Sequence, residues 1–242
     1  MNHLPLPAYI LPLVATATLA VSLSAQADGE KPKPAAAKPQ SLEVARELAA
    51  GKFAGYTYVG NKPAPKTIDE ATFVVATIEA LATKNGVKLA ADAKDKLQKA
   101  VSLDGHKKKD VQAALVAAAK LKKKKVIGFG DLPAWASGVQ HALVEAGLGE
   151  AIDASKAEPG DFVHWWFQYK SGNWGYHVGI VESIQKGRAV IYGAHKSSLA
   201  SERKAASADR KGGIGSGPLL QLSAKDKKLF VVRFKAAAKK GD

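Results

Sequence analysis

Residues 158–181 read EPGDFVHWWFQYKSGNWGYHVGIV. Two runs rich in β-branched and aromatic residues, Phe162–Gln168 and His177–Ile184, are separated here by Ser, Gly and Asn, which favour turns. Later parts of the chain repeat this pattern in three more runs: Ala189–His195, Leu219–Leu222 and Leu229–Phe234. The second half of the chain is therefore predicted to form an antiparallel sheet of about five strands.

The first half of the chain has helical periodicity instead. Thr67 and Glu70 have the spacing of a capping box, and the apolar residues after them recur at helical intervals. Two helical stretches between residues 87 and 125 predict a Lys-rich, surface-facing insertion, and residues 132–147 predict another helix. Helices followed by strands indicate an α+β fold rather than a doubly wound one.

A glycine run, GGIGSG at residues 212–217, lies between two predicted strands and opens no helix. A phosphate-binding turn of the dinucleotide type leads from a strand into a helix, so the context does not fit. We therefore expect a plain loop here.

The start of the chain is predicted to be an export signal. Residues 8–24 form an apolar run that is short for a membrane span, and the Ala-Gln-Ala at residues 25–27 fits a signal-peptidase site. We expect a signal peptide over residues 1–27 and hence a periplasmic or secreted protein. Because Lys and Arg are missing near the start, an uncleaved signal that anchors the chain in a membrane is the alternative.

The rest of the chain is expected to hold a linker and one domain. Residues 28–40, DGEKPKPAAAKPQ, have the Pro, Ala and Lys content that is typical of linkers. Residues 41–242 are numerous enough to form one domain with a sizeable core.

The overall composition restricts the chemistry. The 242 residues carry a formal net charge of +14 and include no cysteine. The charge favours an anionic partner such as a cell-wall polymer, and export argues against nucleic acid. The absence of cysteine excludes disulfides, thiolate metal sites and a cysteine nucleophile.

Three separated segments carry a family resemblance. In chain order they are GYTYVG (55–60) with DEATFV (69–74), then EPGDFV (158–163), then YHVGIV (176–181). They resemble the Tyr-x-x-Gly and Asp-Cys-Ser-Gly-Phe-Val, Pro-Gly-Asp-Leu-Val and His-Val-Gly-Ile signatures of the NlpC-type papain-like cell-wall peptidases and amidases. The resemblance implies a papain-like fold, a sheet packed against an N-terminal helical half, and peptidoglycan as the partner.

The resemblance also implies a site. In that family a thiolate at a helix N-terminus is polarised by a histidine, which a polar residue on the next strand orients. By register, Glu70 takes the place of the cysteine and His177 that of the base. His195 is the third member that we prefer on chemical grounds, whereas alignment points to Tyr192. The two side chains face opposite ways unless a bulge, for example at Gly193, intervenes.

The replacement of cysteine by Glu70 closes the thiol mechanism, because a carboxylate is a poor acyl nucleophile. We expect a catalytically impaired pseudoenzyme that binds peptidoglycan peptides, with Glu70 stabilising its helix. The alternative is an active amidohydrolase in which Glu70, His177 and His195 activate water, directly or around a metal, although we assign no cofactor. A different nucleophile, such as Thr72, has no base predicted beside it.

Further candidates concern ligand binding. Tyr58, Asp69 and Tyr192 are predicted to contact the substrate through the family resemblance. Trp166 and Trp174 flank the predicted site strands, where their rings could stack on sugars, although aromatic residues in strands usually belong to the core. Lysines at positions 107–109, 120 and 122–125 suit anionic wall polymers or lipid headgroups, or form a solvated helix face.

Overall fold

The computed structural model describes residues 39–58, 64–89, 92–101, 108–121, 123–124, 126–196, 212–223 and 228–235. The predicted signal peptide, and the predicted linker up to residue 38, lie outside the described residues. In the ranges that are described, no helix combines the length and the apolar character needed to cross a membrane.

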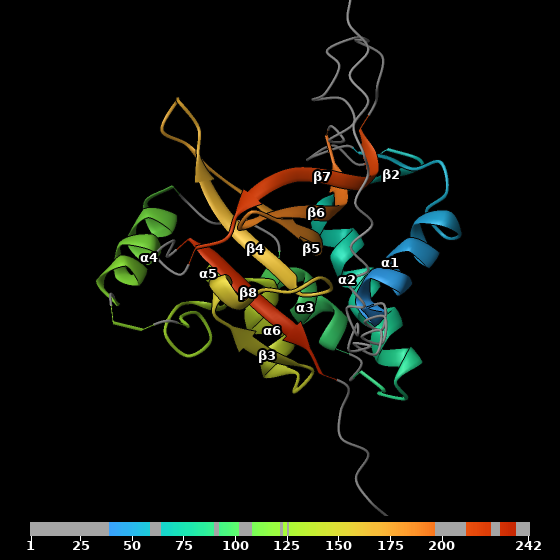
Figure 1. Ribbon diagram of the computed structural model, residues 1–242, viewed down its shortest axis with the longest axis horizontal. Helices are drawn as coiled ribbons and strands as arrows, with labels where there is room; N and C mark the ends of the chain where they lie inside the picture. Colours follow the sequence, from blue (N-terminus) through green and yellow to red (C-terminus); the bar gives the residue numbers. More distant parts are fainter. Residues whose placement is uncertain are drawn as a thin grey trace, which may run out of the picture. The chain divides into compact units, whose positions relative to one another are not determined.

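The described residues form six α-helices, a short 3-10 helix and eight strands (Figure 1). The helices are α1 (Gln40–Ala50), α2 (Glu70–Lys84), α3 (Ala93–Val101), α4 (Lys108–Lys120), α5 (Ala134–Ser137), α6 (Val139–Glu145) and the 3-10 helix η1 (Ala154–Lys156). The strands are β1 (Thr57–Tyr58), β2 (Thr67–Ile68), β3 (Gly149–Ile152), β4 (Phe162–Gln168), β5 (Trp174–Gln185), β6 (Arg188–His195), β7 (Gly213–Gln221) and β8 (Leu229–Phe234).

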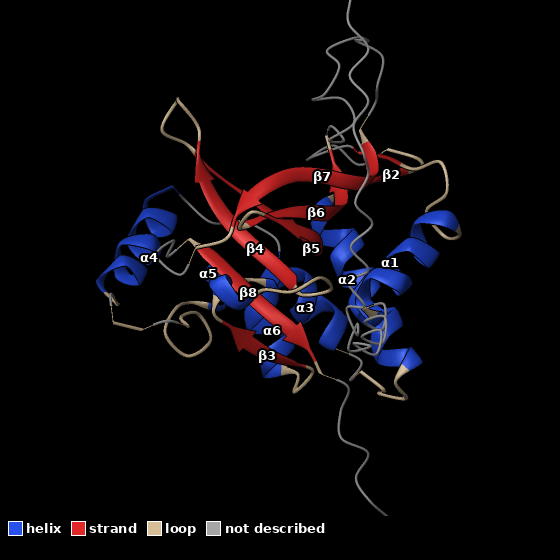
Figure 2. Cartoon of the chain, in the orientation of Figure 1, coloured by secondary structure: helices blue, strands red, loops and turns tan. Residues whose placement is uncertain are grey.

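All eight strands belong to one sheet, in the order β2-β1-β7-β6-β5-β4-β8-β3. The sheet is mixed, because β1 and β2 are parallel while the other pairs are antiparallel. It curls into a half-barrel (Figure 2). The predicted papain-like arrangement, an antiparallel sheet of about five strands packed against an N-terminal helical half, is therefore wrong. The added strands have only two to four residues, too few for alternation to be visible in the sequence.

The five predicted strands are all present. β4 and β8 have the predicted bounds, and β5 begins three residues earlier, at Trp174. The glycine run predicted to be a loop instead opens β7, where Gly213 pairs with His195 and Gly215 with Gly193. Glycine favours turns when it is judged locally, and pairing with β6 overrides this preference.

The helical predictions for the chain before residue 126 need two corrections. Thr67 does not cap α2 but lies in β2, and the N-cap is Asp69, whose Oδ1 accepts a hydrogen bond from the backbone N–H of Thr72 at 2.6 Å. The segment from 87 to 125 is not simply surface-facing, because Leu97 and Val101 of α3 are buried in the core cluster that also holds α2. Hydrophobic burial on one face of α3 decides its position.

The Pro-Gly-Asp turn before β4 is fixed by polar contacts. Asp161 is buried and accepts two hydrogen bonds from the guanidinium of Arg233 in β8, at 2.9 and 3.0 Å. Its carboxylate also accepts from the backbone N–H of Glu158 at 2.8 Å. On the other side of the turn, the hydroxyl of Ser41 donates to the carbonyl of Gly160 at 2.6 Å. These contacts attach α1 and β8 to the start of β4.

Gly138 divides the helix predicted over residues 132–147 into α5 and α6. Its φ is +51°, in the left-handed region that favours glycine, and a Cβ atom placed there would lie 1.7 Å from Nδ1 of His164. The backbone at Gly138 therefore packs directly against the imidazole of His164 in β4, and no side chain fits between them.

Replacement of Gly138 by alanine is expected to destabilise the fold by about 3 kcal/mol or more, from a left-handed backbone penalty and an atomic overlap. Gly130→Ala is the matched control, because Gly130 also has a positive φ (+79°) but open space around its Cα. The control should cost only about 1–2 kcal/mol. Urea unfolding measures both, and equal losses would contradict the packing described for Gly138.

Candidate functional site

The candidate site lies where β5 and β6 separate. Their pairing runs from Gln185 and Arg188 to Ile180 and Tyr192, and no pair follows although both strands, fully described here, continue. In β5, the backbone N–H of Val178 lies beyond the last pair and donates to Oε2 of Glu70 at 3.1 Å. A side chain from α2 thus satisfies a buried backbone group of the sheet.

Glu70 is the first residue of α2 and is 5% exposed. Its Oε1 lies 2.5 Å from Nδ1 of His177. Burial raises the pKa of Glu70, but the hydrogen bond with His177 and the nearby His195 outweigh burial, so the pKa lies below its ordinary value. The carboxyl is therefore ionised at neutral pH, and the imidazole N–H is the donor. The N-terminal end of α2 also favours a negative charge.

His177 is held between its charged partner and an aromatic wall. Its ring stacks on Phe167, with centroids 4.7 Å apart, and lies 5.0 Å from the ring of Trp165, its cross-strand neighbour. The His177 side chain is 33% exposed. Because Nδ1 is engaged by Glu70, Nε2 is the ring nitrogen left for a ligand.

His195, the third member preferred from the sequence, is brought to the site. Its Nδ1 lies 3.8 Å from Oε1 of Glu70, too far for a hydrogen bond, although His195 still contributes to the lowered pKa of Glu70. The ring is buried, and within the described structure neither ring nitrogen has a hydrogen-bond partner. His195 and His177 therefore lie near the same carboxylate oxygen.

The glycine run of β7 makes room for His195. A Cβ atom on Gly217 would lie 2.1 Å from Cδ2 of His195, and one on Gly193 would lie 3.3 Å from the same ring. Gly217, which belongs to the glycine run predicted to form a loop, therefore lies in the wall of the site. Only the pairing of β6 with β7 reveals this, and no local pattern could have done so.

Tyr192 lies elsewhere. Its ring packs 6.2 Å from that of Phe73, and the guanidinium of Arg46 lies 5.7 Å from its centroid. Burial raises the pKa of Tyr192. In the part of the chain that is described, no hydrogen bond or ion pair links Tyr192 to the carboxylate of Glu70, so the structure groups His195, and not Tyr192, with the pair.

Asp69 precedes Glu70 in the chain, and Tyr58 interacts electrostatically with both carboxylates. Their contact with a substrate stays a prediction. Burial, and then the negative charges of Glu70 and Asp69, raise the pKa of Tyr58 to about 12, with a smaller contribution from Tyr169. The phenol therefore keeps its proton at physiological pH. Asp69 is half-buried and already caps α2 through Oδ1.

The two predicted sugar-stacking tryptophans are not at the site. Trp166 is buried in the core and donates from Nε1 to the carbonyl of Ala136 at 2.7 Å. Trp174 donates from Nε1 to Oε1 of Gln112 in α4 at 3.1 Å. Side chains alternate along β4, so the residues that contact His177 are Trp165 and Phe167. Alternation counted from His177 could have found them.

His164 is a core residue with no part in the site chemistry. Its ring is buried near the rings of Trp166, Tyr176 and Phe230. Burial lowers the pKa of His164 to about 3. Neither ring nitrogen has a hydrogen-bond partner among the described residues, so the imidazole is neutral and carries a desolvation cost.

The described residues contain no group of three or more His, Cys, Asp and Glu side chains arranged to hold a metal ion. The residues that meet here supply a carboxylate and imidazoles, which can bind, orient and exchange protons, but the carboxylate is a poor acyl nucleophile. Thr72, another candidate nucleophile, is exposed on α2 and its backbone N–H is used in the helix cap.

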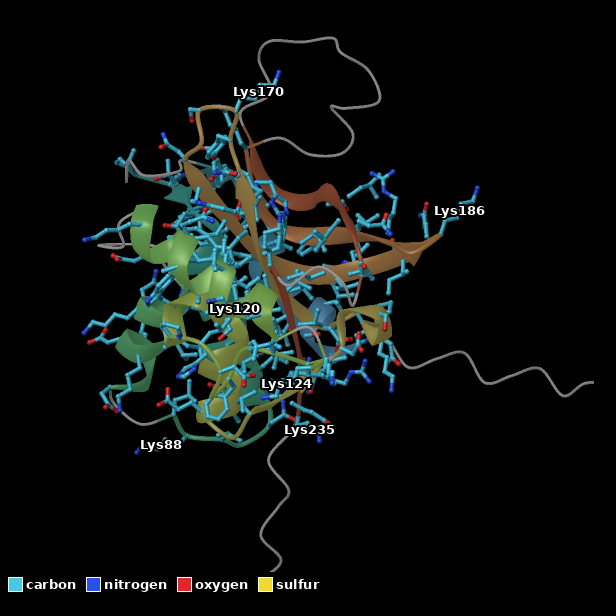
Figure 3. The ribbon with its side chains drawn as sticks, turned by 90° about the vertical axis from the view of Figure 1, so that its left-hand side faces the viewer. Lys88, Lys120, Lys124, Lys170, Lys186 and Lys235 are labelled. Carbon is cyan, nitrogen blue, oxygen red and sulfur yellow. The ribbon has the colours of Figure 1, made fainter. Side chains whose placement is uncertain are left out.

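The lysines are spread over the surface. In Figure 3, Lys170 and Lys186 project from the sheet, while Lys88 and Lys235 lie near the opposite end of the view. Lys124 pairs with Asp131, so its charge is partly neutralised. The predicted basic cluster is described only in part, because positions 107, 122 and 125 lie outside the described residues.

Comparison with known proteins adds no assignment: no family model, no curated protein and no solved structure matches this chain. The resemblance to NlpC-type peptidases therefore stays a prediction from the three sequence segments. We therefore base the proposed function on the contacts of Glu70.

Acid should destabilise the fold through His164. Its folded pKa of about 3 lies below the ordinary 6.5, so its contribution to stability is complete above pH 6.5 and is lost as the pH falls towards 3. The loss is at most about 1.4 kcal/mol for each pH unit.

His164→Leu should remove this part of the acid sensitivity. His141→Leu is the control, because His141 of α6 packs on Phe129 and lies 3.5 Å from Glu145, away from the rings around His164. Unfolding free energies from pH 7 to pH 4 measure the effect. If the unfolding free energy falls equally with pH in wild type and in His164→Leu, protonation of His164 does not contribute to acid destabilisation, and the prediction is wrong.

Proposed function

We propose that the protein is a catalytically impaired cell-wall amidohydrolase relative that binds peptidoglycan peptides beside His177 without cleaving them. One observation carries the proposal. Both oxygens of the Glu70 carboxylate are engaged, Oε1 with the imidazole of His177 and Oε2 with the N–H of Val178. This carboxylate stands where the resemblance places the nucleophile.

The engaged carboxylate is unsuited to attack an amide. Attack would produce an anhydride, which lies far above a thioester in energy. It would also remove the negative charge that satisfies Val178 and His177 in a buried setting. Glu70 instead reproduces the charge of a thiolate beside an imidazole, and its hydrogen bond keeps His177 in place without supplying a nucleophile.

Three features support a cell-wall ligand. Two of the segments that resemble the NlpC signatures meet in space, since Glu70 of the first contacts His177 of the third. The second segment forms the turn into β4, the strand that pairs with β5. The predicted export signal and the charge of +14 agree with an anionic extracellular polymer.

One observation favours a second candidate, hydrolysis by activated water. A partly exposed imidazole whose Nδ1 is bound to a buried carboxylate has the arrangement of a general base, with Nε2 free to take a proton. In this candidate Glu70 orients His177 and a water molecule attacks. The version with a metal has no support in the described residues.

Glu70→Cys is expected to give the protein hydrolytic activity on peptidoglycan stem peptides, while the wild type binds them and cleaves nothing. The substitution places a thiol at the N-terminus of α2, near His177, where a thiolate is stabilised. Glu70→Ala is the matched control, because it removes the carboxylate and adds no nucleophile. Product analysis by mass spectrometry, with binding followed by calorimetry, measures both properties.

Two results would overturn the proposal. Cleavage by the wild type that is lost in Glu70→Gln and in His177→Ala would establish the water-activating candidate. Failure of the wild type to bind any stem peptide would remove the cell-wall assignment itself.

A further inference from the structure

A row of aromatic side chains leads away from His177 along one face of the β4–β5 hairpin. The row consists of Trp165, Phe167 and Tyr169, at alternate positions that share a face. Phe167 stacks on His177, and the ring of Tyr169 meets that of Phe167 edge-on at 4.9 Å. The aromatic row is therefore continuous with the candidate site.

Gly175 allows the aromatic row to form. It pairs with Phe167 across the hairpin, and a Cβ atom there would lie 2.6 Å from Cζ of Phe167 and 2.9 Å from Cε2 of Tyr169. Both rings thus lean over the glycine and make one apolar strip. Any other residue at position 175 would separate them.

Exposure increases along the aromatic row. Trp165 is buried, Phe167 is half-buried, and Tyr169 is 55% exposed, which is high for a large aromatic residue. The backbone N–H of Tyr169 donates to the carbonyl of Asn173 at 2.8 Å, so the hairpin holds the exposed ring on an ordered turn. Lys170, the next residue, marks the tip of the hairpin in Figure 3.

The charges beside the aromatic row select the ligand. Glu70 contacts His177, the ring on which Phe167 of the row stacks, and Asp69 is the residue before Glu70. Both carboxylates also raise the pKa of Tyr58. Although the whole chain carries a net charge of +14, these two carboxylates make this end of the row unfavourable for polyanions such as nucleic acid or phosphate-rich wall polymers. The phenols of Tyr58 and Tyr169 offer neutral hydrogen bonds, which suit hydroxyl and acetamido groups.

We infer that the aromatic row is a binding subsite for uncharged N-acetylated sugar residues of a glycan strand, with Tyr169 as its outer contact. The apolar face of a sugar ring packs on aromatic carbon, and the phenols contact its polar groups. The inference deepens the proposed function and rests on it, because the row continues from the peptide site at His177. A glycan on the row would carry its attached peptide towards His177.

The experiment measures binding to the full chain by calorimetry, using a tetramer of N-acetylglucosamine and, separately, a free stem tetrapeptide. Tyr169→Ala should weaken binding of the sugar tetramer roughly tenfold, as expected for an exposed aromatic anchor. Gln168→Ala, an exposed neighbour on the opposite face of the hairpin, should leave it unchanged. Tetrapeptide binding should persist in both variants.

Chemical-shift mapping on the wild type gives a second measurement that does not depend on any variant folding. The sugar tetramer should perturb the amides of Phe167, Tyr169 and Gly175. Absence of sugar binding, perturbation elsewhere only, or equal affinity of Tyr169→Ala would overturn the inference. Tetrapeptide binding without sugar binding defeats the inference alone, and sugar binding without tetrapeptide binding defeats the proposed function alone.

Discussion

The contact between the Glu70 carboxylate and the His177 imidazole is the interaction on which the site depends. It joins the first turn of α2 to β5 at the point where β5 and β6 separate, and the same carboxylate accepts from the backbone of Val178. Without it, the buried N–H of Val178 and Nδ1 of His177 would each lose their partner. The negative charge is stabilised by these two groups and by the N-terminal end of α2, which Asp69 caps.

The same contact restricts chemistry. A buried carboxylate with two engaged oxygens is stable because it is ionised, and attack on an amide would require it to give up that state. His195 adds a second imidazole 3.8 Å from the same oxygen, in a space that the glycines of β6 and β7 leave open. The arrangement places a negative charge beside an imidazole, as a thiolate would, but it lacks the reactive sulfur. This carboxylate is therefore unsuited to covalent catalysis.

The sequence predicted long elements well and contacts less well. β4 and β8 are bounded apolar runs, and their limits could be found from composition alone. β1 and β2 have two residues each, and only long-range pairing defines them. The sequence predicts Glu70 near a helix start with Thr67 as the cap, whereas Asp69 is the cap in the structure, because both residues are good caps and only the backbone conformation distinguishes them. Residue type alone favours Trp166 as a ligand contact, whereas side-chain alternation counted from His177 selects Trp165 and Phe167. The meeting of Glu70 and His177 followed from a family resemblance and not from any local pattern.

The most direct test of this account is the protonation state of His177, measured on the full chain at pH 7 by long-range proton–nitrogen NMR of the imidazole. The account predicts a proton on Nδ1 that is shielded from exchange by its hydrogen bond to Glu70, with the Glu70 carboxyl carbon at the chemical shift of an ionised group. A bare Nδ1, or a protonated Glu70 carboxyl, would contradict it.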